Sequence, residues 1–445
     1  MRRKRKFIAA SGEAQVFLFW AFLLLALSFM AMNVDVPVVS DILGFYGRWP
    51  ILCLVLLTGM MLFSAEKGVR RWTTVDTSLL VMLTVFGFSA AYSVQPGKSI
   101  LYYLILWFEF GALVMVPRLL DPVYWRRLLV GITGILFVTA VLSLYGYAAG
   151  DALSGGGGRL RSAGINSNSV GACFMMAILI LWTYIYTQRG GLRWLACGAQ
   201  AALLVGLYLT GSRSSLVGMI IGTFFVFALL RRYVSMLVGV VVLVFALMVF
   251  GLIGVAKESV SSSSSMRETL QEDFSTRIMR KEGRVQPDDP FQGRRGPWAQ
   301  ALEQWRNYPW LGNGFGVTDP YSIRPIDGSG YHGMLASVGV LGTIAFAIPP
   351  LILLGSVWRS VRSRHWGNRP VLENDPREIM AFGSGPMVGL LVEGVGEPWM
   401  IGIGSMMVFL YMLGFGACLS AFSWGRHILL VEEHARAQRD YWVPF

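Results

Sequence analysis

The chain has 445 residues, of which 54% are hydrophobic and only 14% are charged. A water-soluble domain carries nearly twice that share of charged residues on its surface, so the composition excludes a soluble globular protein. The formal net charge of +12 would suit a nucleic-acid-binding protein, but the positions of the basic residues point to a membrane instead.

Apolar runs long enough to cross a bilayer follow one another along most of the chain. The N-terminal MRRKRK is followed by polar residues and then by an apolar run without a small-residue cleavage site, which argues against a cleaved signal peptide. Crossing the hydrocarbon core takes about 20 apolar residues. The candidate spans are 16–33, 50–64, 77–95, 99–117, 128–149, 169–187, 193–210, 214–231, 234–255, 333–358, 379–395 and 399–424. The sequence therefore predicts an all-α membrane protein of about 12 transmembrane helices.

The basic residues are distributed unevenly between the two sides of this layout. With the N-terminus inside, the inner segments hold 23 Lys and Arg residues, whereas the short outer loops hold five. An excess of basic residues in short loops marks the cytoplasmic side of a membrane protein. We therefore expect a multi-pass protein of the bacterial inner membrane with both termini in the cytoplasm, and the lipid bilayer rather than nucleic acid as its partner.

One long periplasmic loop divides the spans into two groups. Residues 1–255 hold the first nine spans, 256–332 form the loop subdomain, 333–424 hold the last three spans, and 425–445 form a cytoplasmic tail. Within the loop, the segment WAQALEQW predicts a helix from Trp298 to Trp305 that lies along the membrane surface. The segment NYPWLGNGFG that follows it supplies turns.

Arginines at the outer boundary are the first candidates for binding. Arg213 lies in the short hairpin LTGSRSSLVG between two spans, on the side where basic residues are rare. An arginine there either snorkels at a helix end or serves a function, and its outer position favours a function. Arg159 and Arg161 follow four glycines. Such a loop either holds a phosphate with backbone amides and guanidinium groups or is a plain flexible connector.

The loop helix and the span after it bring three further candidates. Arg294 and Arg295 stand just before the predicted helix, where the helix dipole favours anions, and one of the two fits a solvated surface arginine. His332 stands where the loop enters the tenth span, outside the cytoplasmic segments that hold the other histidines. It can act as an acid, a base or an oriented donor near neutral pH, or be an ordinary interfacial residue.

Acidic residues complete the set. Glu393 and Glu397 are four residues apart near the outer end of the eleventh span, so we expect them to share a helix face and to orient arginines.

A metal site is the competing interpretation of the outer carboxylates. Asp288 and Asp289 in the long loop, or Asp35 and Asp41 in the first outer loop, can hold a divalent cation through oxygen ligands. Flanking prolines make the Asp288–Asp289 pair more typical of a turn. The four cysteines lie in apolar runs without a CxxC or His/Cys spacing, so they indicate neither a disulfide framework nor a zinc site.

Four segments together resemble the bacterial O-antigen ligase and Wzy-type polysaccharide polymerase superfamily. In that family's pattern Arg213 matches the arginine of a Ser-Arg hairpin, Arg294 matches an arginine four residues before Trp298, and His332 matches the histidine that opens a span. Asn usually follows this histidine, whereas Gly333 stands here. The segments are RSAGINSNSVGA (161–172), TGSRSSLVG (210–218), GRRGPWAQALEQWRNYPWLGNGFG (293–316) and YHGMLASVGVLGT (331–343).

The resemblance implies an architecture like that of the GT-C glycosyltransferases and a specific chemistry. Family members transfer a glycan from an undecaprenyl-diphosphate carrier to an acceptor hydroxyl on the periplasmic face, with no cofactor and no metal. Arginine's planar fork suits the anionic diphosphate, and the histidine suits the acceptor's proton. The implied catalytic residues are His332, Arg213 and Arg294, and the implied substrate-binding residues are Arg159, Arg161, Arg295, Glu393 and Glu397.

Three functions compete at this point. A polymerase of O-antigen or exopolysaccharide repeat units is favoured slightly over a ligase that joins the glycan to lipid A–core, because Glu393 near the end of the eleventh span resembles exopolysaccharide polymerases. Chain-length regulators or flippases are candidate protein partners. A lipid-linked oligosaccharide flippase or transporter is the alternative outside enzymes. Against it, the charged residues gather at the outer boundary rather than mid-bilayer, and no repeated halves are visible.

Overall fold

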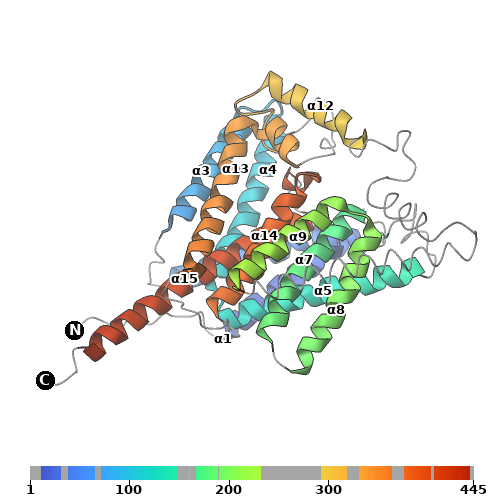
Figure 1. Ribbon diagram of the computed structural model, residues 1–445. Coiled ribbons are helices and arrows are strands. Elements are labelled where there is room, and N and C mark those ends of the chain that lie inside the picture. Colours follow the sequence, from blue (N-terminus) through green and yellow to red (C-terminus); the bar gives the residue numbers. More distant parts are fainter. Residues whose placement is uncertain are drawn as a thin grey trace, which may run out of the picture.

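The computed structural model describes residues 12–31, 39–65, 72–148, 160, 167–188, 190–231, 292–317, 330–362, 375–401 and 405–440. All regular structure within these ranges is helical (Figure 1). The α-helices are α1 (Gly12–Ala31), α2 (Arg48–Ala65), α3 (Thr74–Ala91), α4 (Pro96–Phe110), α5 (Pro122–Ala148), α7 (Ser167–Thr187), α8 (Gly191–Thr210), α9 (Arg213–Leu229), α12 (Gln292–Asn307), α13 (Gly330–Arg362), α14 (Pro376–Glu393) and α15 (Met406–Asp440). Short π or 3-10 segments are η1 (Val39–Tyr46), η2 (Gly111–Met115), η3 (Val116–Leu119) and η7 (Pro398–Ile401).

The prediction of an all-α, multi-pass membrane protein is confirmed. Within the described ranges, nine helical stretches are long and apolar enough to cross a bilayer, and α9 is a shorter apolar helix of 17 residues. Each predicted span in these ranges coincides with a helix, whereas the ninth predicted span, 234–255, lies outside them. Helix α12 accounts for the predicted loop helix, and α15 continues through most of the segment expected as a tail.

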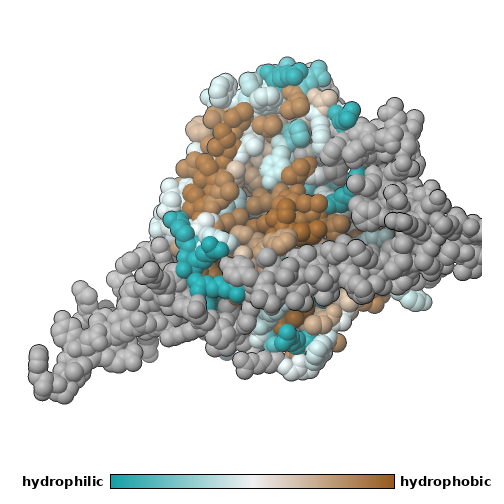
Figure 2. All heavy atoms as spheres, in the orientation of Figure 1, coloured by the Kyte–Doolittle hydropathy of each residue, from teal (hydrophilic) through white to brown (hydrophobic). Residues whose placement is uncertain are grey.

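Apolar side chains cover the outward faces of the spanning helices, as lipid contact requires. On the face shown in Figure 2 they form a band over α3 and α13, between polar residues over α12 and polar residues toward the opposite end. The exposed apolar side chains of α3 and α13 include Leu80, Val81, Leu341, Ile344 and Leu351. In a bilayer these side chains face hydrocarbon and need no protein partner.

Helix α14 lies at the centre of the bundle and packs against α9 and α15 through glycines. A Cβ atom added at Gly218 of α9 would come within 2.5 Å of the carbonyl oxygen of Gly389 in α14. One turn further along α9, a Cβ atom at Gly222 would lie 3.0 Å from the carbonyl oxygen of Gly385. Small residues four apart on both helices let the two backbones approach closely. Because α14 is enclosed by protein, it can carry charged residues at its two ends.

Helix α13 is broken near its start. Gly339 has φ 65° and ψ −168°, a backbone conformation that separates a short first segment from the long remainder of the helix. The turn that follows α12 fills this break. The Asn313 N–H donates to the Ala336 carbonyl at 2.8 Å, and the Gly314 N–H donates to the Ser337 carbonyl at 2.9 Å. The turn therefore satisfies carbonyl groups that the broken helix leaves open.

The helix directions define two ends of the bundle. One end, here called the outer end, gathers the starts of α7, α9 and α13 and the end of α14, and α12 lies across this end of α13 (Figure 1). The opposite, inner end gathers the starts of α1, α3, α5 and α14.

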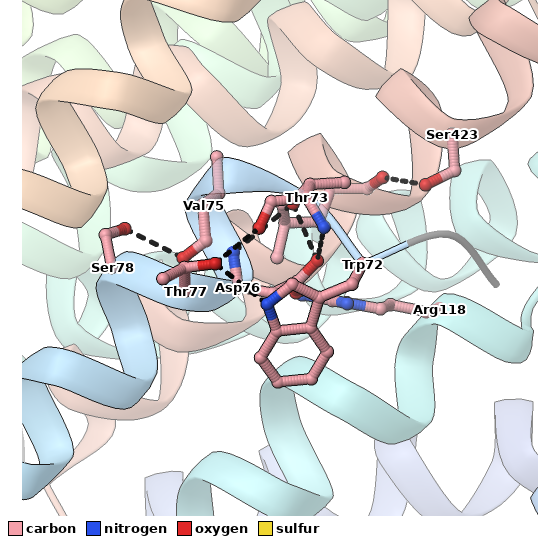
Figure 3. A network of polar contacts seen from close by, with 9 residues as sticks. Trp72, Thr73, Val75, Asp76, Thr77, Ser78, Arg118 and Ser423 are labelled. Atoms are coloured by element: carbon pink, nitrogen blue, oxygen red, sulfur yellow. Dashed lines mark hydrogen bonds and ion pairs between the residues drawn. The ribbon is translucent and has the colours of Figure 1, made fainter.

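Ion pairs hold the inner end together. Thr73 caps α3 in a capping box with Asp76, whose carboxylate also pairs with Arg118 of η3 at 2.5 Å (Figure 3). Arg126 at the start of α5 pairs with the buried Glu378 at the start of α14 at 3.1 Å. These contacts join α3 to η3, and α5 to α14, at the same side of the bundle.

Candidate functional site

The first segment of α13, which carries His332, is held against the end of α14. The Gly330 N–H donates to the Gly394 carbonyl at 2.9 Å, and the Tyr331 hydroxyl donates to the Leu391 carbonyl at 2.8 Å. His332 therefore lies in the first turn of the helix, because α13 begins two residues before it. These contacts fix the backbone beside the histidine at the outer end.

The side chain of His332 meets the loop helix. Its imidazole ring stacks on the indole ring of Trp298 in α12, with the ring centroids 4.9 Å apart and the planes 13° from parallel. Both side chains are half-buried. One turn further along the two helices, Ala301 and Ala336 are both buried and pack together. Small residues at this position let α12 lie close to the first segment of α13.

Arg213 is the first residue of α9, in a tight hairpin with α8. Gly211 ends α8 in a left-handed conformation with φ 59°, and Ser212 is the N-cap residue of α9. The start of α7 lies against this hairpin, since a Cβ atom at Gly171 would come within 2.7 Å of the Ser212 Cβ atom. Arg213 is half-buried. Because it is the first residue of α9, its positive charge lies near a helix N-terminus, where a bound anion is favoured.

The expectation that Glu393 and Glu397 share a helix face is wrong. Helix α14 ends at Glu393, and residues 394–396 form a turn before Glu397, because the glycines at 394 and 396 have low helix propensity. Glu393 is fully buried. Glu397 is half-buried, and the Asn168 side-chain amide donates to its Oε1 atom at 2.7 Å. The glutamates therefore belong to one end of the bundle but to different local structures.

The glycine-rich segment before α7 lies largely outside the described residues, and both Arg159 and Arg161 fall there. Leu160, which stands between them in the sequence, is fully buried. Its N–H donates to the Leu209 carbonyl near the end of α8 at 2.9 Å. This contact anchors the chain beside the hairpin that carries Arg213.

Helix α12 begins earlier than the sequence predicted. It starts at Gln292, so Arg294 and Arg295 belong to its first turn instead of preceding it. The segment WAQALEQW is the amphipathic part of this helix. The preceding GRRGP contains glycine and proline, which disfavour a helix, so the sequence predicted a later start. Arg295 is exposed.

Metal ligands do not gather in the part of the chain that the structure describes: it contains no group of three or more His, Cys, Asp or Glu residues placed to hold a metal ion. Asp41 is an exposed residue of η1. Asp35, Asp288 and Asp289 lie outside the described ranges.

Comparison with known families supplies the remaining evidence. Residues 198–347 match the family model described as O-antigen ligase. This segment runs from α8 through the Arg213 hairpin and α12 to the broken part of α13. Over this segment the chain is similar to the O-antigen ligase family, which supports the resemblance found in the sequence. The comparison with curated proteins gives no match.

The O-antigen ligase segment separates the candidates into two groups. Arg213, Arg294, Arg295 and His332 lie within it, whereas the two glutamates and the arginines before α7 lie outside.

Asn168 and Trp298 have no role that the sequence alone predicts, although both stand in the segments that carry the resemblance. Their contacts with Glu397 and His332 join residues 229 and 34 positions apart in the sequence, and no local pattern reveals such pairs.

Proposed function

We propose that this protein is a glycosyltransferase that moves a glycan from an undecaprenyl-diphosphate carrier to an acceptor hydroxyl at the periplasmic face of the inner membrane. The observation that carries the proposal is the arrangement of the outer end. There the O-antigen ligase segment brings a half-buried arginine at a helix start and a ring-stacked histidine to the same side of the bundle.

The transfer step assigns a role to each residue. The acceptor oxygen attacks the anomeric carbon of the donor sugar, and its proton passes to the imidazole of His332. The bond from that carbon to the diphosphate oxygen breaks, and the diphosphate leaves as an anion. Arg213 and Arg294 stabilise the negative charge that develops on it. Arg159, Arg161 and Arg295 are proposed to bind the diphosphate or glycan outside the reacting atoms.

Helix geometry supports an anionic substrate at this end. The starts of α7, α9 and α13 lie at this end, and each helix start carries a partial positive charge. A guanidinium group at such a position adds a full charge with a planar pair of donors that fits phosphate oxygens.

Within this activity, we propose polymerisation of O-antigen or exopolysaccharide repeat units, with ligation to lipid A–core as the alternative. Glu393 supports the polymerase, because an acidic residue at the end of this span resembles exopolysaccharide polymerases, and here it is a fully buried residue at the end of the central helix α14. Glu397 and its partner Asn168 are proposed to contribute to the same recognition.

Purified protein in lipid nanodiscs provides the test. It is given an undecaprenyl-diphosphate-linked repeat unit, either alone or together with lipid A–core, and the products are separated by size. We expect carrier-linked products of increasing length without lipid A–core, and the same rate with EDTA present. Products that require lipid A–core would identify a ligase. No transfer under either condition would contradict the proposed function.

Reporter fusions test where the site lies. Fusions after Gly316 and Val395 at the outer end are expected to be periplasmic, and fusions after Arg362 and Arg436 are expected to be cytoplasmic. A cytoplasmic result at Gly316 would contradict the periplasmic site, because α12 and His332 lie at the same end as this residue.

A further inference from the structure

We propose that Trp298 is a positioning residue for His332, and that α12 thereby links the proposed base to the arginine in its own first turn. This inference rests on the proposed function and adds a role for the loop helix. It concerns a residue that touches the base rather than the reacting atoms.

The ring stack constrains the base. A tryptophan ring 4.9 Å from the imidazole, and only 13° from parallel with it, covers one face of the imidazole and fixes the plane of the ring. The two nitrogen atoms lie in that plane, at its edges, so the stack selects the directions in which they can accept a proton. Proton transfer requires this alignment, because a base must lie within hydrogen-bond reach of the hydroxyl that it deprotonates.

Three contacts fix α12 itself. Ala301 packs on Ala336, one turn beyond the stacked rings. The Trp305 indole donates to the Pro309 carbonyl at 3.1 Å, which closes the turn after the helix. The N–H groups of Asn313 and Gly314 in that turn donate to carbonyl groups at the break in α13. Trp298 is therefore presented by a helix that is anchored on the same segment of α13 that carries His332.

Helical spacing connects this stack to one of the two arginines. Residues four apart in a helix lie on the same face, so position 294 lies on the face that carries Trp298 and Ala301. Position 295 lies about a quarter of a turn away from the centre of that face, and its side chain is exposed. Position 294 and Trp298, the residue that orients the base, therefore lie on the same face of α12, the face that contacts α13.

A double-mutant cycle tests the role of Trp298. Trp298→Ala is expected to lower turnover by about 10- to 100-fold, the cost typical of a misplaced catalytic group, with donor binding unchanged. In a His332→Ala background the same substitution is expected to have no further effect. Trp298→Phe keeps a flat ring and is expected to stay near wild-type turnover, whereas Trp298→Leu is expected to behave like Trp298→Ala.

Trp305→Ala is the matched control, because Trp305 is a half-buried tryptophan of the same helix whose contact is with Pro309. Its effect is expected to be the same with and without His332. Three results would overturn the inference while leaving the proposed function intact: full activity of Trp298→Ala, full activity of Trp298→Leu, or a Trp298→Ala effect that persists without His332. An inactive wild-type protein would instead contradict the proposed function.

Discussion

The two ends of the helix bundle are held together by different kinds of contact. At the inner end, arginines meet carboxylates across helices, as in the pairs Arg118–Asp76 and Arg126–Glu378. At the outer end, the described contacts between elements include backbone hydrogen bonds, close glycine packing, the Asn168–Glu397 hydrogen bond and the ring stack on His332. In these two pairs the charges neutralise one another. At the outer end, an arginine is the first residue of α9, and positive charge at a helix start favours an anion brought by a substrate.

This difference has an energetic meaning. A buried ion pair gains little stability over an apolar pair, but removing one partner is costly because the other charge stays buried. The inner end therefore fixes the relative positions of α3, α5 and α14. If the outer end is the catalytic end, substitutions there should change turnover more than stability, and substitutions at the inner end should do the reverse.

The largest effect is expected for His332→Ala. Removing a general base typically costs about 100- to 10,000-fold in rate, so turnover should fall by that factor. Donor binding should be spared, since the base acts on the acceptor. Turnover and carrier-lipid binding are measured separately on membrane-inserted protein. A loss of donor binding in this variant, together with an intact Arg213→Ala variant, would mean that the two roles are assigned wrongly.

Arg213→Ala is expected to lower turnover by about 30- to 1,000-fold, because one stabilising contact to the leaving diphosphate is lost. Arg213→Lys should recover only part of this loss, since lysine keeps the charge without the planar fork. Arg193→Ala serves as the control: Arg193 is an exposed arginine near the inner start of α8. Equal turnover of Arg213→Ala and Arg193→Ala would remove the distinction between the two ends.

At the inner end, Glu378→Ala should affect stability. It leaves the half-buried Arg126 without its carboxylate partner, at a cost of up to about 3–5 kcal/mol in the free energy of unfolding. Thermal unfolding in detergent gives the stability, and turnover per folded molecule should match that of the wild type. Glu13→Gln, at an exposed residue of the same end, should change stability by less than about 0.5 kcal/mol. A stable Glu378→Ala variant with reduced turnover would place catalytic importance at the inner end.

Hydropathy predicted the spanning helices well because a bilayer imposes the same demand on each: a long apolar segment with its backbone hydrogen bonds closed internally. It predicted local detail less well. Glu393 and Glu397 were expected on one helix, but the glycines at 394 and 396 end α14 between them.

The break in α13 was missed for a related reason. Residues on both sides of Gly339 are apolar, so hydropathy shows one continuous span, and only the turn after α12 explains why the helix can stop there. The stack of Trp298 on His332 depends on this long-range packing and had no local sequence signal.

The smallest expected effect comes from the glycine at that break. Gly339→Ala puts a side chain on a residue with φ 65°, and the added Cβ atom would collide with the backbone of Trp310. Forcing a non-glycine residue into such a conformation costs about 1–3 kcal/mol, measured as a loss in the free energy of unfolding. Turnover should fall as well, because the break sets the direction of the segment that carries His332. Gly355→Ala is the matched control in the same helix, where an added Cβ atom meets nothing within 4 Å, and it should leave both quantities near their wild-type values. If Gly339→Ala lowered stability without changing turnover, the break would serve the packing of α13 alone. The outer end would then owe its activity to its side chains and not to the broken helix.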